Sequence, residues 1–223
     1  MKKVLLITII LLIAVAIFFL TKDTAVEDIN QAIETNANLS VNLPLPVNES
    51  ITVDDTGEFS PPLIRTKERV TKKEFGDYIT PGTSPVQPER FQGYHTGTDF
   101  EIFTEELDSD VSVHAICTGQ LLLKQQSNGY GGVVIQKCQL EGESITITYG
   151  HLRLSSVEWA LDEEITKGQT IGVLGANLSS ETDGERKHLH LALHQGTDLN
   201  IRGYVSSQAE LDNWLDPCLY VCQ

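Results

Sequence analysis

Four histidines and one aspartate of this 223-residue chain fall into three short motifs whose residue types suit a metal site. The motifs are His95-Thr-Gly-Thr-Asp99, Tyr149-Gly-His151-Leu152 and His188-Leu-His190. Imidazole nitrogen and carboxylate oxygen are common ligands of zinc. In the first and third motifs the spacing is even, which on a strand places both side chains on one face. A catalytic zinc takes three protein ligands and one water, so the motifs offer a full ligand set and leave two histidines over.

In this order the motifs resemble those of the M23 peptidase family, of lysostaphin and LytM type. Members of that family are zinc metalloendopeptidases that cut peptide bonds in bacterial peptidoglycan. Three segments between the motifs also resemble the family: Val113-His-Ala115 with Gly119, Asn128 to Ile135, and Ile165 to Gly172. The resemblance covers roughly residues 75–200, and three ordered motifs are more specific than any one of them.

The resemblance implies one zinc ion per domain, held by His95, Asp99 and His190. It also implies that His151 and His188 are the catalytic pair beside the water. The sequence has no His-Glu-x-x-His motif, and hence no glutamate base of the kind found in other zinc peptidases. We expect His188 to act as general base and His151 to orient the water or donate to the oxyanion, although the sequence does not fix which does which.

Tyr149 lies two residues before His151, so on a continuous strand it would face the same cavity. There it would bind substrate. The alternatives are that Tyr149 packs in the core or lies at the rim of the cavity.

The sequence departs from the family in residues 176–187, which are polar and charged and lack the usual proline. This departure lies at the expected wall of the groove and leaves the choice of substrate open.

Turn signals recur at short intervals from residue 78 onward, separated by short stretches rich in β-branched residues. This pattern predicts an all-β catalytic domain, an antiparallel β-sheet sandwich or partly open barrel. A sequence resembling a capping box predicts one short helix at Ser155–Leu161. The expected order along the chain is a membrane anchor or signal peptide (1–21), a flexible acidic linker (22–74), the M23-like domain (75–205) and a C-terminal extension with a cysteine pair (206–223).

The N-terminus carries two lysines followed by an apolar run of 17 residues from Val4 to Leu20, broken by Thr8. A signal-peptide core has about 7–15 apolar residues and a membrane-spanning helix about 17–25, and good cleavage sites are lacking. We therefore expect an uncleaved transmembrane helix that leaves the catalytic domain in the cell envelope, outside the cytoplasm. Secretion after cleavage is the alternative.

The expected linker is acidic at first and basic at its end. Residues 23–60 hold eight acidic and no basic residues, a composition that buries too little apolar surface to fold. Five basic residues then fall within positions 65–73. These residues either contact a polyanion such as wall polymer or form a solvated segment balanced by Glu68 and Glu74.

Four cysteines are consistent with export. A hairpin that turns at Asn128-Gly129 brings Cys117 and Cys138 to similar positions on paired strands, so we expect disulfides 117–138 and 218–222. Four cysteines allow three pairings, and a second metal site is the alternative. The net charge of −15 makes nucleic acid an unexpected partner. The expected partners are stem or bridge peptides of peptidoglycan and the membrane, with the chain as a monomer.

Three classes of function fit these features. The first is an active zinc endopeptidase acting on peptidoglycan. The second is a non-catalytic module of the same fold that binds wall or regulates another hydrolase, and the third is an envelope protein that stores zinc. The intact set of five site residues favours the first.

The location can be tested by cell fractionation followed by N-terminal sequencing. With residues 4–20 retained, the protein should stay with the membrane fraction and its catalytic domain should be open to protease added from outside. A soluble form that begins between Ala16 and Asp28 would contradict this expectation and show that the apolar run is a cleaved signal peptide.

Overall fold

The computed structural model of the chain describes residues 58–223. The apolar run and most of the expected linker lie outside these residues. The strands are β1 (Tyr78–Ile79), β2 (Gly93–His95), β3 (Thr98–Glu101), β4 (Ser112–His114), β5 (Gly119–Ser127), β6 (Gly131–Leu140), β7 (Glu143–Gly150), β8 (Glu164–Ile165), β9 (Thr170–Val173), β10 (His188–Gln195), β11 (Tyr204–Val205) and β12 (Trp214–Leu215). The helices are short: η1 (Thr66–Arg69), η2 (Thr104–Glu106), η3 (Leu154–Ser156), η4 (Ser180–Thr182), α2 (Gln208–Leu211) and α3 (Cys218–Val221). Within the described part, no helix has the length and apolar character needed to cross a bilayer.

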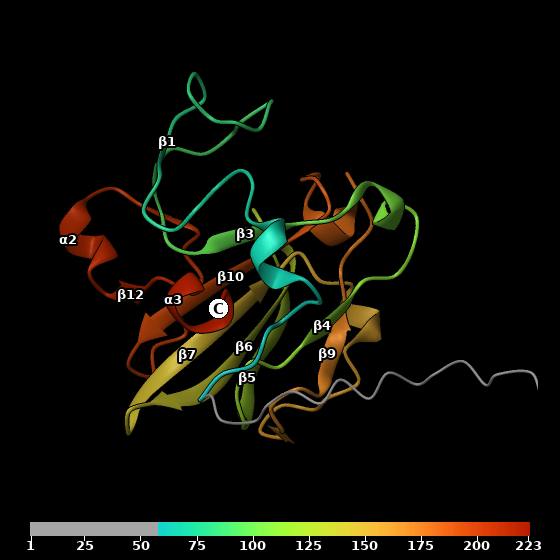
Figure 1. The fold of residues 1–223 in the computed structure, drawn as a ribbon, viewed down its shortest axis with the longest axis vertical. Coiled ribbons are helices and arrows are strands. Elements are labelled where there is room, and N and C mark those ends of the chain that lie inside the picture. The colour runs from blue at the N-terminus through green and yellow to red at the C-terminus, as the bar shows by residue number, and fades with distance from the viewer. Residues whose placement is uncertain (1–57) are drawn as a thin grey trace, which may run out of the picture. The chain divides into compact units, whose positions relative to one another are not determined.

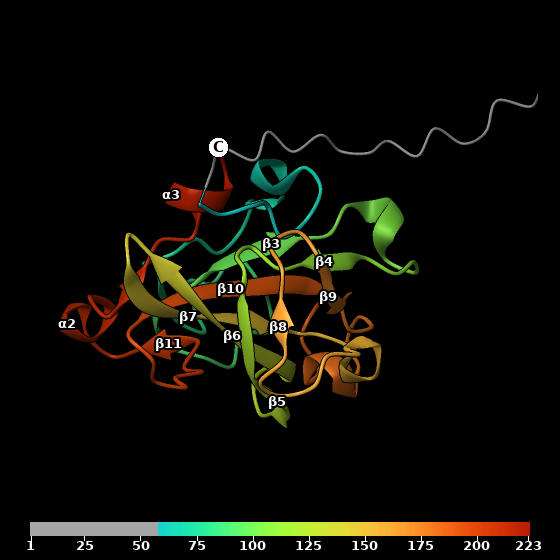
Figure 2. The ribbon, with the colours of Figure 1, turned by 90° about the horizontal axis from the view of Figure 1, so that it is seen from below.

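The largest sheet is antiparallel and is organised around β10 (Figure 1). Its strand order is β12-β10-β7-β6-β5-β8, and β3 pairs with β10 off this path. A three-stranded sheet, β1-β2-β11, and the pair β4-β9 complete the described fold, and β8 runs beside β5 at the end of the large sheet (Figure 2). The predicted all-β, antiparallel architecture is confirmed, and among residues 58–223 the strands do not close into a barrel.

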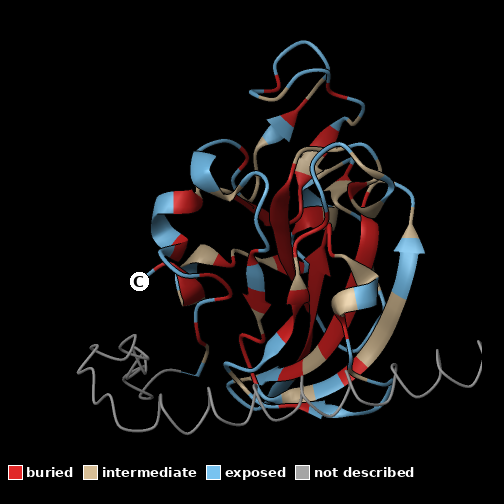
Figure 3. Ribbon diagram, turned by 90° about the vertical axis from the view of Figure 1, so that its right-hand side faces the viewer, coloured by how far each residue is buried: buried red, intermediate tan, exposed pale blue. Residues whose placement is uncertain are grey.

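The sequence of β10 alternates between leucine and polar or small residues, and this alternation divides its two faces. Leu189, Leu191 and Leu193 belong to the main hydrophobic core. His188 and His190 point to the opposite face, yet both are buried as well. β10, β3 and the end of β7 are buried along nearly their whole length. Figure 3 shows buried strands at the centre of the domain. A strand enclosed on both faces holds its side chains rigidly, as a ligand site requires.

The hairpin and the disulfides agree with the sequence. β5 and β6 pair antiparallel up to Ser127 and Gly131, so the predicted turn at Asn128-Gly129 is confirmed. The cysteines form the expected pairs Cys117–Cys138 and Cys218–Cys222, and none is free. The first bond links the start of the hairpin to β6, and the second closes the last helix of the chain.

The predicted helix at Ser155–Leu161 is wrong, because the chain forms only the single turn η3 and then extends. The hydroxyl of Ser156 donates to the carbonyl of Arg153 at 2.6 Å and accepts from the backbone N–H of Val173 at 2.9 Å. These bonds tie the turn to β9. Val157 is buried in the core, which favours an extended exit from the turn over a helix.

Residues 58–74, which we assigned to the linker, pack against the β-domain. Leu63, Arg69 and Lys73 are buried. Four of the five basic residues of this segment form ion pairs within the domain: Arg65 with Glu68, Arg69 with Glu106, Lys72 with Glu101 and Lys73 with Glu89. These four cations are thus neutralised by the domain's own carboxylates, and none of them needs a polyanion as partner.

Arg69 joins this segment to the rest of the domain. Its guanidinium is bidentate to the carboxylate of Glu106, with both N–O distances at 2.7 Å, and it also donates to the carbonyls of Ile64 and Glu101. The Arg69 side chain is fully buried, and 16% of the Glu106 side chain is exposed. The hydrogen bonds from Arg69 are the main reason why the pKa of Glu106 lies below its ordinary value.

Arg69→Met tests this anchor. Loss of one partner of a buried ion pair leaves Glu106 charged and poorly solvated, so the free energy of unfolding should fall by about 3 kcal/mol in urea titrations. The matched control is Arg65→Met, which breaks an exposed pair with Glu68 in the same segment and should leave the urea midpoint nearly unchanged. Equal midpoints for both variants would contradict the anchoring role.

Candidate metal centre

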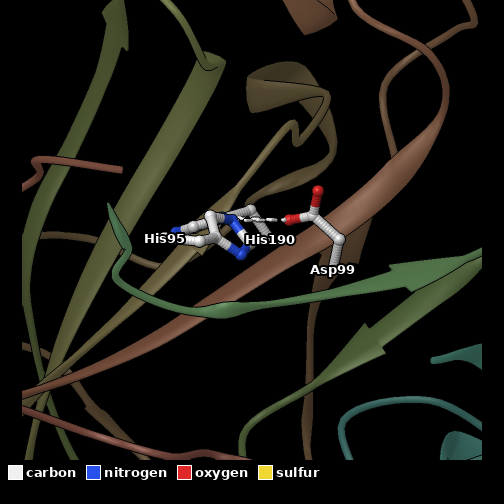
Figure 4. Close-up of side chains that lie close together, drawn as sticks. All are labelled: His95, Asp99 and His190. Atoms are coloured by element: carbon white, nitrogen blue, oxygen red, sulfur yellow. Dashed lines mark hydrogen bonds and ion pairs between the residues drawn. The ribbon is translucent and has the colours of Figure 1, made fainter. Parts of the chain in front are cut away.

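Three side chains from three strands converge on one point (Figure 4). His95 ends β2, Asp99 lies in β3 and His190 lies in β10. The Nε2 atom of His95 is 3.1 Å from Nδ1 of His190 and 3.3 Å from Oδ1 of Asp99, and the latter two atoms are 3.1 Å apart. All three residues are buried. The residues that the sequence predicted as metal ligands thus form one compact triangle of ligand atoms.

The pairing of two strands and one glycine position the three ligand side chains. In the antiparallel register of β3 with β10, His190 stands opposite Asp99. Between β2 and β3 the chain passes close to β10 at Gly97. A Cβ atom there would lie 2.3 Å from the carbonyl oxygen of Leu191 and 2.9 Å from Nε2 of His190. The glycine of the first motif is therefore needed so that the backbone can approach the strand that carries His190.

The protonation states of the three ligand side chains suit the binding of a cation. Nδ1 of His95 lies 3.0 Å from the carbonyl oxygen of Glu74, which can only accept, so Nδ1 carries the proton and Nε2 presents a lone pair. That lone pair faces a carboxylate oxygen of Asp99. For four-coordinate zinc with bonds of about 2.0–2.1 Å, tetrahedral geometry places ligand atoms about 3.3 Å apart. The observed separations and the N, N, O donor set therefore fit zinc.

The two remaining histidines lie beside the triangle in one cavity of about 430 Å³. Nε2 of His188 is 3.3 Å from Oδ2 of Asp99, and its Nδ1 donates to the backbone carbonyl of Arg186 at 2.9 Å. The rings of His151 and His188 have centroids 4.2 Å apart. Nδ1 of His151 is buried and has no hydrogen-bond partner within the described chain. The structure thus brings all five predicted site residues together around one cavity.

Burial and neighbouring charge set the ionisation of the site. Burial raises the pKa of Asp99, but the neighbouring imidazoles of His188 and His95 and the guanidinium of Arg186 outweigh it, so the pKa lies well below its ordinary value. Burial, followed by the neighbouring His188, holds the pKa of His151 well below its ordinary value. Burial also lowers the pKa of His190 to about 4. At neutral pH the aspartate is ionised and these two histidines are neutral, the forms that bind metal or accept a proton.

Tyr149 does not line the cavity, contrary to its predicted place beside His151. It is fully buried in the core, and its hydroxyl donates to Oε1 of Gln136 and accepts from the backbone N–H of Ile116, both at 3.0 Å. β7 ends at Gly150, and His151 adopts a left-handed conformation with φ 63°. Because the strand alternation stops there, the two side chains do not share a face.

The sequence analysis assigned no individual role to Tyr130, Arg186 or Tyr204, although all three line the cavity. Tyr130 follows the hairpin turn, and its ring packs 5.2 Å from that of His190. The Tyr204 ring lies 5.2 Å from that of His95, and its hydroxyl accepts from Lys73 at 2.9 Å. Tyr130 stands inside a segment that resembles the family, whereas no spacing pattern in the sequence marks Tyr204.

Peptidase family M23 matches residues 93–201 of the sequence, a range that holds all five site residues. Residues 93–201 therefore form an M23 peptidase domain, which spans a little under half of the chain. No curated protein sequence gives a significant match to the chain.

Three solved structures are similar to the fold. The catalytic domain of lysostaphin from Staphylococcus simulans is 20% identical, with 69% of this chain and 92% of that chain covered and a TM-score of 0.46. LytU is 20% identical, with 68% of this chain and 83% of the LytU chain covered and a TM-score of 0.44. Csd3 of Helicobacter pylori is 18% identical, with 74% and 35% covered and a TM-score of 0.44, so this chain spans about a third of its length. At these TM-scores the likenesses carry no argument about function.

His190→Ala tests the ligand assignment. Removing one of three ligands should abolish stoichiometric zinc in the purified protein, measured by atomic emission, while the fold persists. The matched control is His194→Ala, on the same strand but packed against Trp214 outside the cavity, which should keep one zinc per chain. Full zinc retention in His190→Ala would refute the assignment.

Proposed function

We propose that this protein is a zinc-dependent endopeptidase that hydrolyses peptide bonds of bacterial peptidoglycan. The observation that carries the proposal is the convergence of His95, Asp99 and His190, with two further histidines in the same cavity of an M23 domain. The triangle is the proposed zinc site, and the histidine pair replaces the glutamate base of other zinc peptidases.

Zinc bound at this site would polarise the scissile carbonyl and lower the pKa of a bound water to about 7. His188 is the proposed general base, because its Nδ1 proton is donated to the Arg186 carbonyl and the lone pair of the imidazole is therefore on Nε2. The proton taken up at Nε2 would then pass to the amine nitrogen of the leaving peptide. His151, neutral and buried beside His188, is placed to orient the water or to donate to the oxyanion.

The proposed substrates are stem or bridge peptides of the wall, and the proposed location is the cell envelope. Membership of the M23 family supports the choice of substrate. The two disulfides support an oxidising compartment outside the cytoplasm. The apolar run from Val4 to Leu20 supports a membrane anchor that keeps the domain near the wall.

His151→Ala and His188→Ala separate catalysis from metal binding. Each should keep one zinc per chain but lower the rate of peptidoglycan hydrolysis by roughly 10²–10⁴, the usual contribution of one acid–base group. The rate is followed by the release of new amino groups from purified peptidoglycan, with the wild-type chain measured alongside. His114→Ala is the control, since His114 lies outside the cavity and should keep the wild-type rate.

Two results would count against the proposal. Wild-type rates in both variants would show that the two histidines are not catalytic. A wild-type protein that binds zinc and peptidoglycan but releases no amino groups would instead support the non-catalytic module.

A further inference from the structure

Arg186 makes a contact with the site that the motif spacing does not predict. It lies two residues before β10, and 13% of its side chain is exposed. Its Nη2 donates to Oδ2 of Asp99 at 2.8 Å and to Oε1 of Glu101 at 2.5 Å. Its Nε also donates to the Glu101 carboxylate, at 2.9 and 3.0 Å. One guanidinium thus bridges the candidate ligand and a second carboxylate on the same strand.

The two oxygens of Asp99 therefore have different neighbours. Oδ1 faces Nε2 of His95 and Nδ1 of His190 and completes the triangle of ligand atoms. Oδ2 accepts from Arg186 and lies 3.3 Å from Nε2 of His188. Because a charge-assisted hydrogen bond fixes Oδ2, the carboxylate plane is set and only Oδ1 points to the triangle.

The charge of Arg186 is balanced where it stands. Glu101 is opposite His188 in the β3–β10 register, and its carboxylate meets the guanidinium side-on. Lys72, whose side chain is 40% exposed, lies 3.2 Å from the other carboxylate oxygen. The Arg186–Glu101 pair as a unit carries no net charge, so Glu101 offsets part of the repulsion between the guanidinium and a cation at the triangle. The guanidinium also orients the Asp99 carboxylate.

We propose that Arg186, held in place by Glu101, is a positioning residue that keeps Asp99 in the orientation in which Oδ1 alone binds zinc. This inference rests on the proposed function, since it concerns the same metal site. Partners that orient metal ligands in this way typically contribute 10–100-fold to metal affinity. The backbone carbonyl of Arg186 also accepts a hydrogen bond from Nδ1 of His188, so one residue contacts both a ligand and the proposed base.

The test is the double variant Glu101→Leu/Arg186→Met of the full chain. It removes a cation and an anion together, so the net charge is unchanged, and apolar side chains of similar size replace a buried ion pair at little cost to folding. Asp99 nevertheless loses the donor to Oδ2. The dissociation constant for zinc, measured by competition with a chromogenic chelator, should rise about 10–100-fold. Urea unfolding of the zinc-free protein, measured alongside, shows whether the double variant is folded.

Arg186→Lys is a second variant that decides the matter if the double variant does not fold. Lysine keeps the charge but cannot bridge two carboxylates with a planar fork, so zinc binding should again weaken by about tenfold. The control is Arg90→Met, which breaks exposed ion pairs with Asp183 and Glu185 just before Arg186 and should leave the zinc constant unchanged.

The outcomes separate this inference from the proposed function. If the wild type binds one zinc and a folded double variant binds it within twofold of the wild-type constant, the positioning role is overturned and the proposed function stands. If zinc affinity falls in the double variant but not in Arg90→Met, the inference is supported. A wild-type chain that binds no zinc overturns both.

Discussion

The antiparallel pairing of β3 with β10 is the constraint on which the rest of the site depends. It sets Asp99 opposite His190, and the pairing of β10 with β7 sets the same histidine opposite Gly150. Side chains alternate along a strand, so a shift of one residue would turn His190 into the leucine core and put leucine into the cavity. The hydrophobic pattern of β10 therefore fixes both the core and the register that assembles the ligands.

The same arrangement buries polar groups, and their partners are supplied by segments outside the motifs. Asp99 is fully buried beside Arg186, and Lys73 forms a buried pair with Glu89 while donating to Tyr204. Burial of an isolated charge is costly, and Asp99 and Lys73 are each paired and hydrogen-bonded. Lys73 also accepts the N–H of Asp99 at its backbone carbonyl, which ties the segment before β1 to the strand that carries the ligand.

Much of the site could be predicted from the sequence, because its ligands recur in short motifs with strand spacing and known metal chemistry. The β-rich fold, the hairpin and the disulfides followed from turn residues and register. The place of Tyr149 did not, because the alternation stops where His151 turns to a positive φ. The packing of residues 58–74 was missed because burial of Arg69 depends on Glu106, 37 residues away, which no local pattern reveals.

The central claim is that one zinc binds at the point where His95, Asp99 and His190 meet. The most direct measurement is an anomalous difference map from crystals of the zinc-loaded chain, collected on both sides of the zinc absorption edge. We predict a single strong peak about 2.0–2.1 Å from Nε2 of His95, Nδ1 of His190 and Oδ1 of Asp99. No peak there, or a peak bound by other side chains, would contradict the claim.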